Sequence, residues 1–187
     1  CDKYNIEYYF KASYDKANRS HANNTRGVGL HETIKDFLQM EESLDVKILT
    51  DVHEVDHIQY LKDVVKVLQI PAFLCRQTDL IQAASETDCI VNIKKGQFLA
   101  PEDIIGILSK TEQAKEVWIT ERGTSFGYGR LINDFTGMYD ILTNLGGNFV
   151  YDVTHSVQQP GGTSTGASSC SCWGRSWDYF FFLRSTS

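Results

Sequence analysis

Apolar runs alternate with helix-patterned segments six times along this 187-residue chain, and this alternation constrains the fold more than any other feature. The expected strands are short and almost continuously apolar: 6–10, 46–50, 67–70, 89–93, 117–120 and 149–155. Strands that alternate with helices predict a parallel sheet. Continuous apolar character is typical of strands whose two faces are both covered.

The segments between these strands carry the apolar period of helices. The clearest is 30–44, with apolar residues at Leu30, Ile34, Phe37, Leu38 and Leu44. The other expected helices are 56–66, 76–86, 101–112 and 131–145, and a glycine-rich loop is expected at 124–129.

Five of the six expected strands end in polar or charged residues, namely Lys11, Lys16, Asp51, His53, Lys94, Arg122, Asp152 and His155, whereas 67–70 ends at Pro71. In a TIM (β/α)8 barrel the carboxyl ends of all strands converge on one face, where the active site lies. A doubly wound open sheet is the competing α/β architecture. No G-x-G-x-x-G or G-x-x-x-x-G-K-[ST] motif follows the first strand, which weakens a nucleotide-binding interpretation and favours the barrel.

Six strands are two fewer than a closed barrel has, and a typical barrel needs about 250 residues. We expect one strand to precede Cys1 and another to follow His155, where Tyr179–Leu183 is a poor candidate. The interpretation is therefore an incomplete barrel over 1–162 and a divergent tail over 163–187. A change of reading frame near 163–170 is the hypothesis for that tail.

The net charge of -6 argues against a general nucleic-acid or anionic-membrane binder, whose footprint would be basic. No apolar run is long enough to span a bilayer, and no signal peptide is recognisable. Cys75 and Cys89 lie in apolar surroundings and are expected to be reduced core thiols, while Cys170 and Cys172 lack a familiar zinc or redox spacing. A reducing cytoplasm is the expected compartment.

Against this acidic background, the segment Lys11–Ser20 gathers two lysines, one arginine, two hydroxyls and an amide after the first strand. Fixed cations with hydroxyl donors suit an anion that has several oxygens, above all phosphate or carboxylate. The alternative is a solvated turn with scattered charges. Repetition of polar strand ends along the chain favours the anion site.

The same segment, read as F-K-A-S-Y-D-K-A-N-R-S over 10–20, resembles a signature of the 3-deoxy-D-manno-octulosonate 8-phosphate synthase family. The resemblance continues in order through 50–54, 69–80, 92–98, 121–128 and 152–158, and it covers about 6 to 162. Related 3-deoxy-heptulosonate 7-phosphate synthases carry K-P-R-[ST] where this chain has Lys16-Ala17-Asn18-Arg19.

The resemblance implies an aldol-type condensation of phosphoenolpyruvate with arabinose 5-phosphate and water, with release of phosphate, in lipopolysaccharide sugar biosynthesis. It also implies a homotetramer, with Arg19 acting across a subunit boundary. The implied phosphoenolpyruvate clamp consists of Lys11, Lys16, Lys94 and Arg122, with Ser13 and Gln97 nearby. The implied arabinose 5-phosphate site includes Asn18, Arg19 and Ser20, and Asp51 is expected to hold the sugar hydroxyls. Further substrate-binding residues in the matched motifs are Ala72, Arg76 and Phe126.

His155 resembles the histidine that ligates the metal in metal-dependent members of that family. The other ligands of those members, a cysteine in the first strand, a late glutamate and an aspartate, are not identifiable in this sequence. Metal-independent members keep the histidine, so the resemblance leaves open whether there is no cofactor or a divalent metal. The alternative for His155 is a hydrogen bond within the barrel mouth.

Two further functions stay open at this point. One is a 3-deoxy-heptulosonate 7-phosphate synthase, which shares the barrel and the chemistry. The other is a catalytically inactive remnant that still binds phosphorylated ligands.

Overall fold

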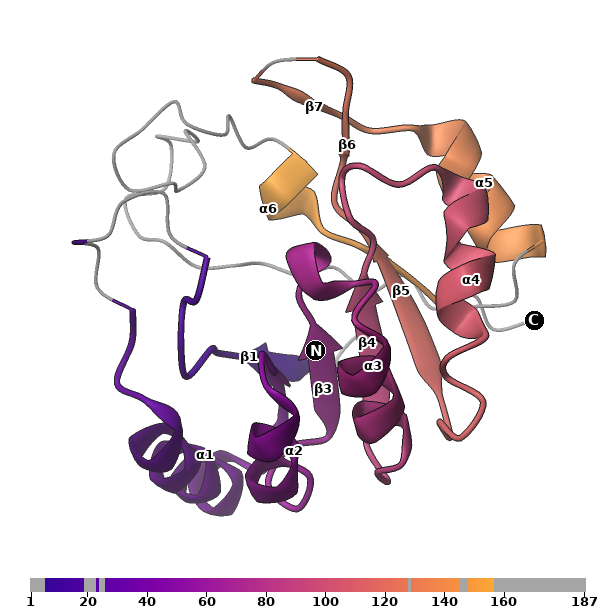
Figure 1. Cartoon of the computed structure of the whole chain (residues 1–187). Coiled ribbons are helices and arrows are strands. Elements are labelled where there is room, and N and C mark those ends of the chain that lie inside the picture. Colours follow the sequence, from indigo (N-terminus) through magenta and orange to yellow (C-terminus); the bar gives the residue numbers. More distant parts are fainter. Residues whose placement is uncertain (1–5, 19–22, 24–25, 128, 145–147, 157–187) are drawn as a thin grey trace.

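Six parallel strands form one curved sheet in the computed structural model, which describes residues 6–18, 23, 26–127, 129–144 and 148–156 (Figure 1). The strands are β1 (Tyr9–Lys11), β2 (Lys47–Asp51), β3 (Val67–Ile70), β4 (Ile90–Lys94), β5 (Val117–Glu121) and β8 (Asn148–Tyr151). Their order in the sheet is β1-β2-β3-β4-β5-β8, so the six strands pair in the order in which they follow one another in the chain, with β6 and β7 lying outside this sheet. A doubly wound sheet would reverse its order at a switch point, so the predicted barrel architecture is confirmed as a curved, partial barrel.

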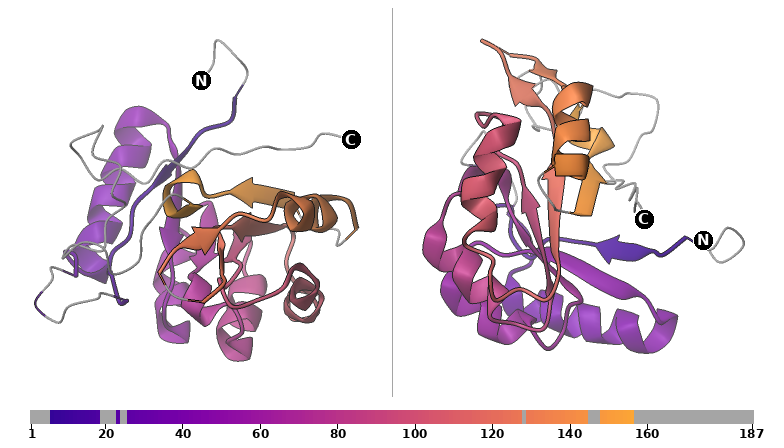
Figure 2. Two further views of the ribbon diagram at one scale, coloured as in Figure 1. Left: turned by 90° about the horizontal axis from the view of Figure 1, so that it is seen from above. Right: turned by 90° about the vertical axis from the view of Figure 1, so that its right-hand side faces the viewer.

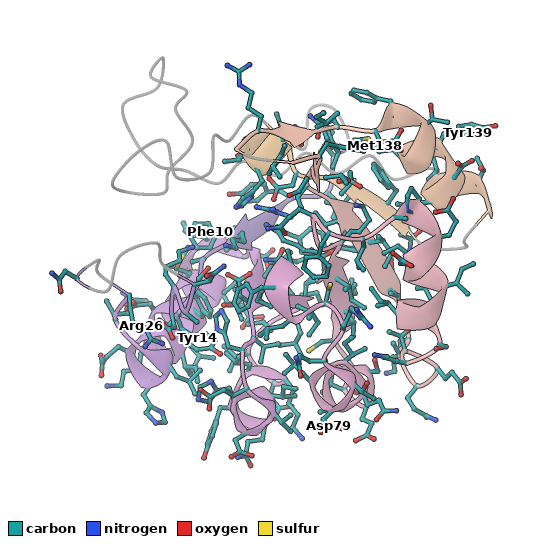
Figure 3. All side chains as sticks on the ribbon, turned by 45° about the horizontal axis from the view of Figure 1, so that its top comes forward. Phe10, Tyr14, Arg26, Asp79, Met138 and Tyr139 are labelled. Atoms are coloured by element: carbon teal, nitrogen blue, oxygen red, sulfur yellow. The ribbon has the colours of Figure 1, made fainter. Side chains whose placement is uncertain are left out.

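The helices lie along the outer side of this sheet (Figures 1 and 2). They are α1 (Leu30–Leu44), α2 (Val55–Leu61), α3 (Thr78–Ser85), α4 (Ile104–Leu108) and α5 (Phe135–Asn144), with 3-10 turns η2 (Ala72–Leu74) and η3 (Pro101–Asp103) before α3 and α4. Figure 3 shows how α5 packs: Met138 turns toward the body of the molecule, whereas Tyr139 turns outward. None of the helices that the structure describes has the length and apolarity needed to cross a membrane.

Successive side chains along each strand face opposite sides of the sheet, and the two sides differ in character. The main core lies between sheet and helices, and its strand residues are Ile48, Leu68, Ile70, Val91, Ile93, Ile119 and Phe149. A second apolar cluster lies on the concave side, formed by Tyr9, Leu49, Val67, Ile90, Trp118 and Val150. Further along the same alternation, toward the carboxyl ends, the concave positions are polar: Lys11, Asp51, Gln69, Asn92, Lys94, Thr120, Arg122 and Asp152. The concave side therefore changes from apolar to charged along the barrel.

The expected elements 30–44 and 67–70 are confirmed residue for residue as α1 and β3. The opening strand was predicted to begin too early. Ile6 and Tyr8 are 56% and 51% exposed, and the pairing of β1 with β2 begins at Tyr9. The helix expected over 101–112 is also wrong at its end. There the side chains of Ser109 and Thr111 bond to preceding carbonyls and replace the helical continuation.

The expected helix 131–145 begins only at Phe135. Leu131–Ile132 is instead a strand, β7, paired antiparallel with β6 (Thr124–Ser125), so the expected glycine-rich loop is the tip of a small hairpin. Asp134 starts α5, because its carboxylate accepts the backbone N–H groups of Thr136 and Gly137.

The buried free thiols of Cys75 and Cys89 are confirmed. The possible last strand at Tyr179–Leu183, the tail 163–187 and Cys170 and Cys172 lie outside the described residues.

Candidate active site

The first cluster of the site joins the end of β1 to the end of β2 through one serine hydroxyl. The ammonium groups of Lys11 and Lys16 each donate to Ser13 Oγ over 2.9 Å, and Ser13 in turn donates to Asp51 Oδ2. Lys11 Nζ also lies 3.2 Å from Asp51 Oδ2, and both side chains are nearly buried. Two cations and a hydroxyl thus share one small volume with a carboxylate that lies 35 to 40 residues further along the chain.

Asp51 is held in its anionic form by this cluster. Burial alone would raise the pKa of the Asp51 carboxyl, but Lys11, Lys94 and the Ser13 hydroxyl, together with Lys16, outweigh it and hold the pKa well below its usual range. Gln69 Nε2 donates to Asp51 Oδ1, so both carboxylate oxygens have donors.

The second cluster centres on Asp152, just after β8, whose side chain is fully buried. Lys94 Nζ lies 2.7 Å from Asp152 Oδ2, and His155 Nδ1 lies 2.6 Å from the same oxygen. Burial opposes ionisation of Asp152, but Lys94 and His155 hold its pKa well below the usual range. Burial, reinforced by Lys94, lowers the pKa of His155, so the imidazole is neutral at pH 7.

The sequence predicted His155 at the end of a strand, and this is wrong: His155 lies on α6 (Val153–Ser156). Asp152 ends the strand because its Oδ1 accepts the backbone N–H of His155 over 3.0 Å, as an N-cap does. Asp152 was noted as a polar strand end but was not among the predicted site residues. The signal that identifies it is an aspartate between an apolar strand and a histidine three residues later.

Arg122 follows β5 and is 9% exposed. Its guanidinium has no hydrogen-bond or ion-pair partner among the residues that the structure describes. Burial lowers the pKa of Arg122, an effect opposed by the charges of Asp152 and Glu121. Lys11, Lys16, Lys94 and Arg122 thus outnumber the carboxylates Asp51 and Asp152 by two, which suits an anionic ligand.

Two residues that the sequence did not single out support Arg122 from the helix-facing side. Glu121 Oε1 accepts the backbone N–H groups of Arg122 and Gly123 over 2.9 and 2.6 Å. Its Oε2 lies 3.3 Å from Lys95 Nζ, and both side chains are at most 2% exposed. Gly123 adopts φ 94°, and a Cβ there would lie 2.9 Å from Leu131 Cβ, so the turn requires glycine.

Tyr14 anchors the loop that carries Ser13 and Lys16. Its buried hydroxyl lies 2.9 Å from His57 Nδ1, and it accepts the backbone N–H of His53 over 3.2 Å. Burial raises the pKa of Tyr14 to about 12. Tyr14 and Arg26, which pairs with Asp15, both belong to this long β1–α1 connection (Figure 3). The loop of the first cluster is therefore fixed to the β2–α2 connection.

Not all predicted site residues lie in these clusters. Ala72 is buried in η2, and Gln97 is half-buried with its Oε1 lacking a hydrogen-bond partner in the described structure. Arg76, Phe126 and Asn18 are exposed and form no hydrogen bond or ion pair with the described residues of either cluster. Arg19 and Ser20 lie outside the described residues.

His155 is also the predicted metal ligand. Its Nδ1 faces a carboxylate, the usual outer partner of a metal-bound histidine, which leaves Nε2 as the coordinating atom. Within the described ranges, however, no group of three or more His, Cys, Asp or Glu side chains is arranged to hold a metal ion. The described donors therefore do not make a complete metal centre.

We expect acid to destabilise the protein in two successive pH ranges. The lowered pKa values of His53 and His155 mean that the unfolded chain binds protons more readily, so stability falls as pH drops below about 6.5. The lowered pKa values of Asp51 and Asp152 add stability that is complete above about 3.9 and is lost as pH falls toward their folded values. Urea unfolding between pH 7 and 3 measures this; a constant free energy of unfolding would contradict it.

Together, the curved parallel sheet and the charged residues gathered at its carboxyl ends define a protein of the (β/α)8-barrel class with a cation-rich mouth. The model of the DAHP synthetase I family matches residues 1–170, and the chain belongs to this family.

Curated relatives make the comparison more specific. The chain is 49% identical over 170 residues to the 2-dehydro-3-deoxyphosphooctonate aldolase of Bartonella tribocorum. The aligned region covers 90% of this chain and 60% of the relative. The protein of the same name from Fusobacterium nucleatum is 48% identical over 170 residues (90% and 61%), and that of Bartonella bacilliformis is 48% identical over 164 residues (87% and 58%). The chain spans about three fifths of the length of these relatives.

Proposed function

We propose that this chain carries the site of a 3-deoxy-D-manno-octulosonate 8-phosphate synthase, the enzyme that its relatives' name, 2-dehydro-3-deoxyphosphooctonate aldolase, also denotes. The reaction joins phosphoenolpyruvate to arabinose 5-phosphate, consumes water and releases phosphate. The observation that carries the proposal is Arg122: it is nearly buried, its guanidinium has no hydrogen-bond or ion-pair partner among the described residues, and it lies at a mouth where the described cations outnumber the carboxylates. Such a group is stable only if water or an anionic ligand completes its hydrogen bonds.

The charges of the substrates explain why so many cations gather. Two phosphate groups and one carboxylate bring about five negative charges together, and their mutual repulsion has to be offset. Lys11, Lys16, Lys94 and Arg122 supply four fixed positive charges at the carboxyl ends of three strands. The same charges stabilise the negative charge that develops as the enol carbon attacks the sugar aldehyde and water adds to the neighbouring carbon.

The two clusters differ in what they offer a substrate. In the first, the Asp51 carboxylate provides acceptors for sugar hydroxyls, and the Ser13 hydroxyl lies with the cations Lys11 and Lys16, which suit phosphoenolpyruvate. In the second, the neutral His155 beside Asp152 is suited to accept or orient a proton of the attacking water. Holding both substrates in this rigid mouth supplies a large part of the rate acceleration.

A heptulosonate synthase is the second candidate, because the matched family model bears that enzyme's name. The sequence Lys16-Ala17-Asn18-Arg19 and the shared name of the relatives favour the octulosonate enzyme. The two differ in their sugar, arabinose 5-phosphate or erythrose 4-phosphate, so the sugar decides between them.

The test is calorimetric titration of the chain with phosphoenolpyruvate and with each sugar phosphate, followed by a phosphate-release assay with both substrates. We expect binding of phosphoenolpyruvate and a preference for arabinose 5-phosphate. A preference for erythrose 4-phosphate would transfer the proposal to the second candidate, and absence of phosphoenolpyruvate binding would overturn both. Binding without phosphate release would identify the inactive ligand-binding form.

A further inference from the structure

A chain of hydrogen bonds crosses four neighbouring strands on the concave side of the sheet. Thr120 Oγ1 on β5 donates to Asn92 Oδ1 on β4 over 2.6 Å, and Asn92 Nδ2 donates to Gln69 Oε1 on β3 over 3.1 Å. Gln69 Nε2 then donates to Asp51 Oδ1 on β2. Thr120 and Asn92 are fully buried, and Gln69 is 1% exposed. We call these four side chains the ladder.

The direction of the ladder is set by the charge at one end. An ionised Asp51 only accepts hydrogen bonds, so Gln69 has to present its NH2 group to it. The oxygen of Gln69 then faces Asn92, which must present its own NH2 group, and the oxygen of Asn92 requires a donor. The hydroxyl of Thr120 is that donor. Each amide is thereby locked in one of its two orientations.

We propose that Thr120 and Asn92 are positioning residues that act through Gln69 to hold the Asp51 carboxylate in the orientation that the substrate site uses. The inference rests on the proposed function for the role of Asp51 toward the sugar phosphate. With Oδ1 taken by Gln69, Oδ2 is the oxygen turned to Ser13 and Lys11. The ladder therefore links β5, which ends beside Arg122, to the first cluster.

Loss of the Thr120 hydroxyl removes the donor at the far end of the ladder from Asp51. Asn92 Oδ1 would then be buried without a donor. If the Asn92 amide rotated by half a turn, Oδ1 would instead face Gln69 Oε1, and two acceptors would meet. Gln69 relieves that repulsion only by turning its own oxygen toward Asp51. Burying unpaired polar atoms is costly, so the amides would exchange between orientations rather than settle in one.

Thr120→Val tests this, because valine keeps the shape and removes only the hydroxyl. Thr50→Val is the matched control: Thr50 is also a fully buried strand threonine, and its Oγ1 has no hydrogen-bond partner in the described structure. Thr120→Ser restores the donor and is the rescue variant. Melting temperatures of the four proteins establish that they are folded, and Thr120→Ala replaces the valine variant if that one does not fold.

The first readout is hydrogen exchange of the side-chain NH2 groups of Asn92 and Gln69, observed by NMR. We expect the exchange rate to rise about tenfold in Thr120→Val and to be unchanged in Thr50→Val. In Thr120→Ser the rate should be that of the unmutated protein. The second readout is calorimetry: affinity for arabinose 5-phosphate should fall about five- to tenfold in Thr120→Val, while affinity for phosphoenolpyruvate stays within about twofold.

An unchanged exchange rate of the amides in Thr120→Val would contradict the inference that the Thr120 hydroxyl orders the ladder. Faster exchange with unchanged sugar affinity would overturn the positioning role, as would equal losses for both ligands, which indicate a merely structural effect. If the unmutated chain binds neither ligand, the proposed function fails, and the exchange measurement still decides whether the ladder orders the amides.

Discussion

Replacing Arg122 by alanine is expected to weaken phosphoenolpyruvate binding by about 30- to 150-fold, because charged hydrogen bonds contribute about 2 to 3 kcal/mol. Arg122 is 9% exposed and its guanidinium has no hydrogen-bond or ion-pair partner in the described structure, so its donors are available to a ligand. Arg122→Lys keeps the charge but loses the planar pair of donors, and we expect it to lose about tenfold. Calorimetry at fixed ionic strength measures both.

The control for net charge is Arg130→Ala, which removes an exposed arginine beside the β6–β7 hairpin. It should leave the affinity unchanged. Arg122→Ala should also leave the free energy of unfolding within about 1 kcal/mol of the original, because no protein hydrogen bond of the guanidinium is lost. Equal affinities in the two alanine variants would remove the main support for the proposed function.

Lys95→Met is expected to lower the free energy of unfolding by about 3 to 5 kcal/mol, because it leaves the buried carboxylate of Glu121 without its counter-charge. The ammonium also donates to the carbonyl of Leu99 and to Thr124 Oγ1, both over 3.1 Å, so two acceptors lose their donor as well. For a chain of this size the melting temperature should fall by about 6 to 20 °C. Urea unfolding and thermal melting measure the effect.

Lys115→Met is the matched control, because Lys115 pairs with Asp88 on the surface, where both side chains are largely exposed. The free energy of unfolding of Lys115→Met should differ from that of the unmutated protein by no more than is usual for a surface substitution. The double variant Lys95→Met with Glu121→Leu removes both buried charges and should recover part of the loss. Equal melting temperatures for Lys95→Met and Lys115→Met would show that the buried pair is not required.

The architecture followed from the sequence because each strand carries its own signal. Val67–Ile70 is a short apolar run closed by Pro71, and Leu30–Leu44 has a full helical period. Such local patterns decide element type without knowledge of tertiary contacts. The β6–β7 hairpin escaped prediction because strands of two residues carry no period, and its turn depends on glycines with positive φ.

The site was predictable only in part, for a related reason. Lys11, Lys94 and Arg122 stand at strand ends, and strand ends of a barrel converge whatever their distance in sequence. Gln69, Asn92 and Thr120 lie within apolar strands, where a single polar residue resembles ordinary strand composition. Only the packing of neighbouring strands reveals that these three side chains bond to one another. The pair Lys95 and Glu121 was missed likewise, because its two members come from different strands.

The sequential strand order has a consequence for how the sheet forms and opens. Because the six strands of the sheet pair in their order along the chain, the loops closed during assembly are short, and assembly can proceed one βα unit at a time. Backbone amides of β3 and β4, which have partners on both sides, should open least often, and protection should decline stepwise toward β1 and β8. A fold built in this way gains or loses a unit at its end without any other strand changing its partner.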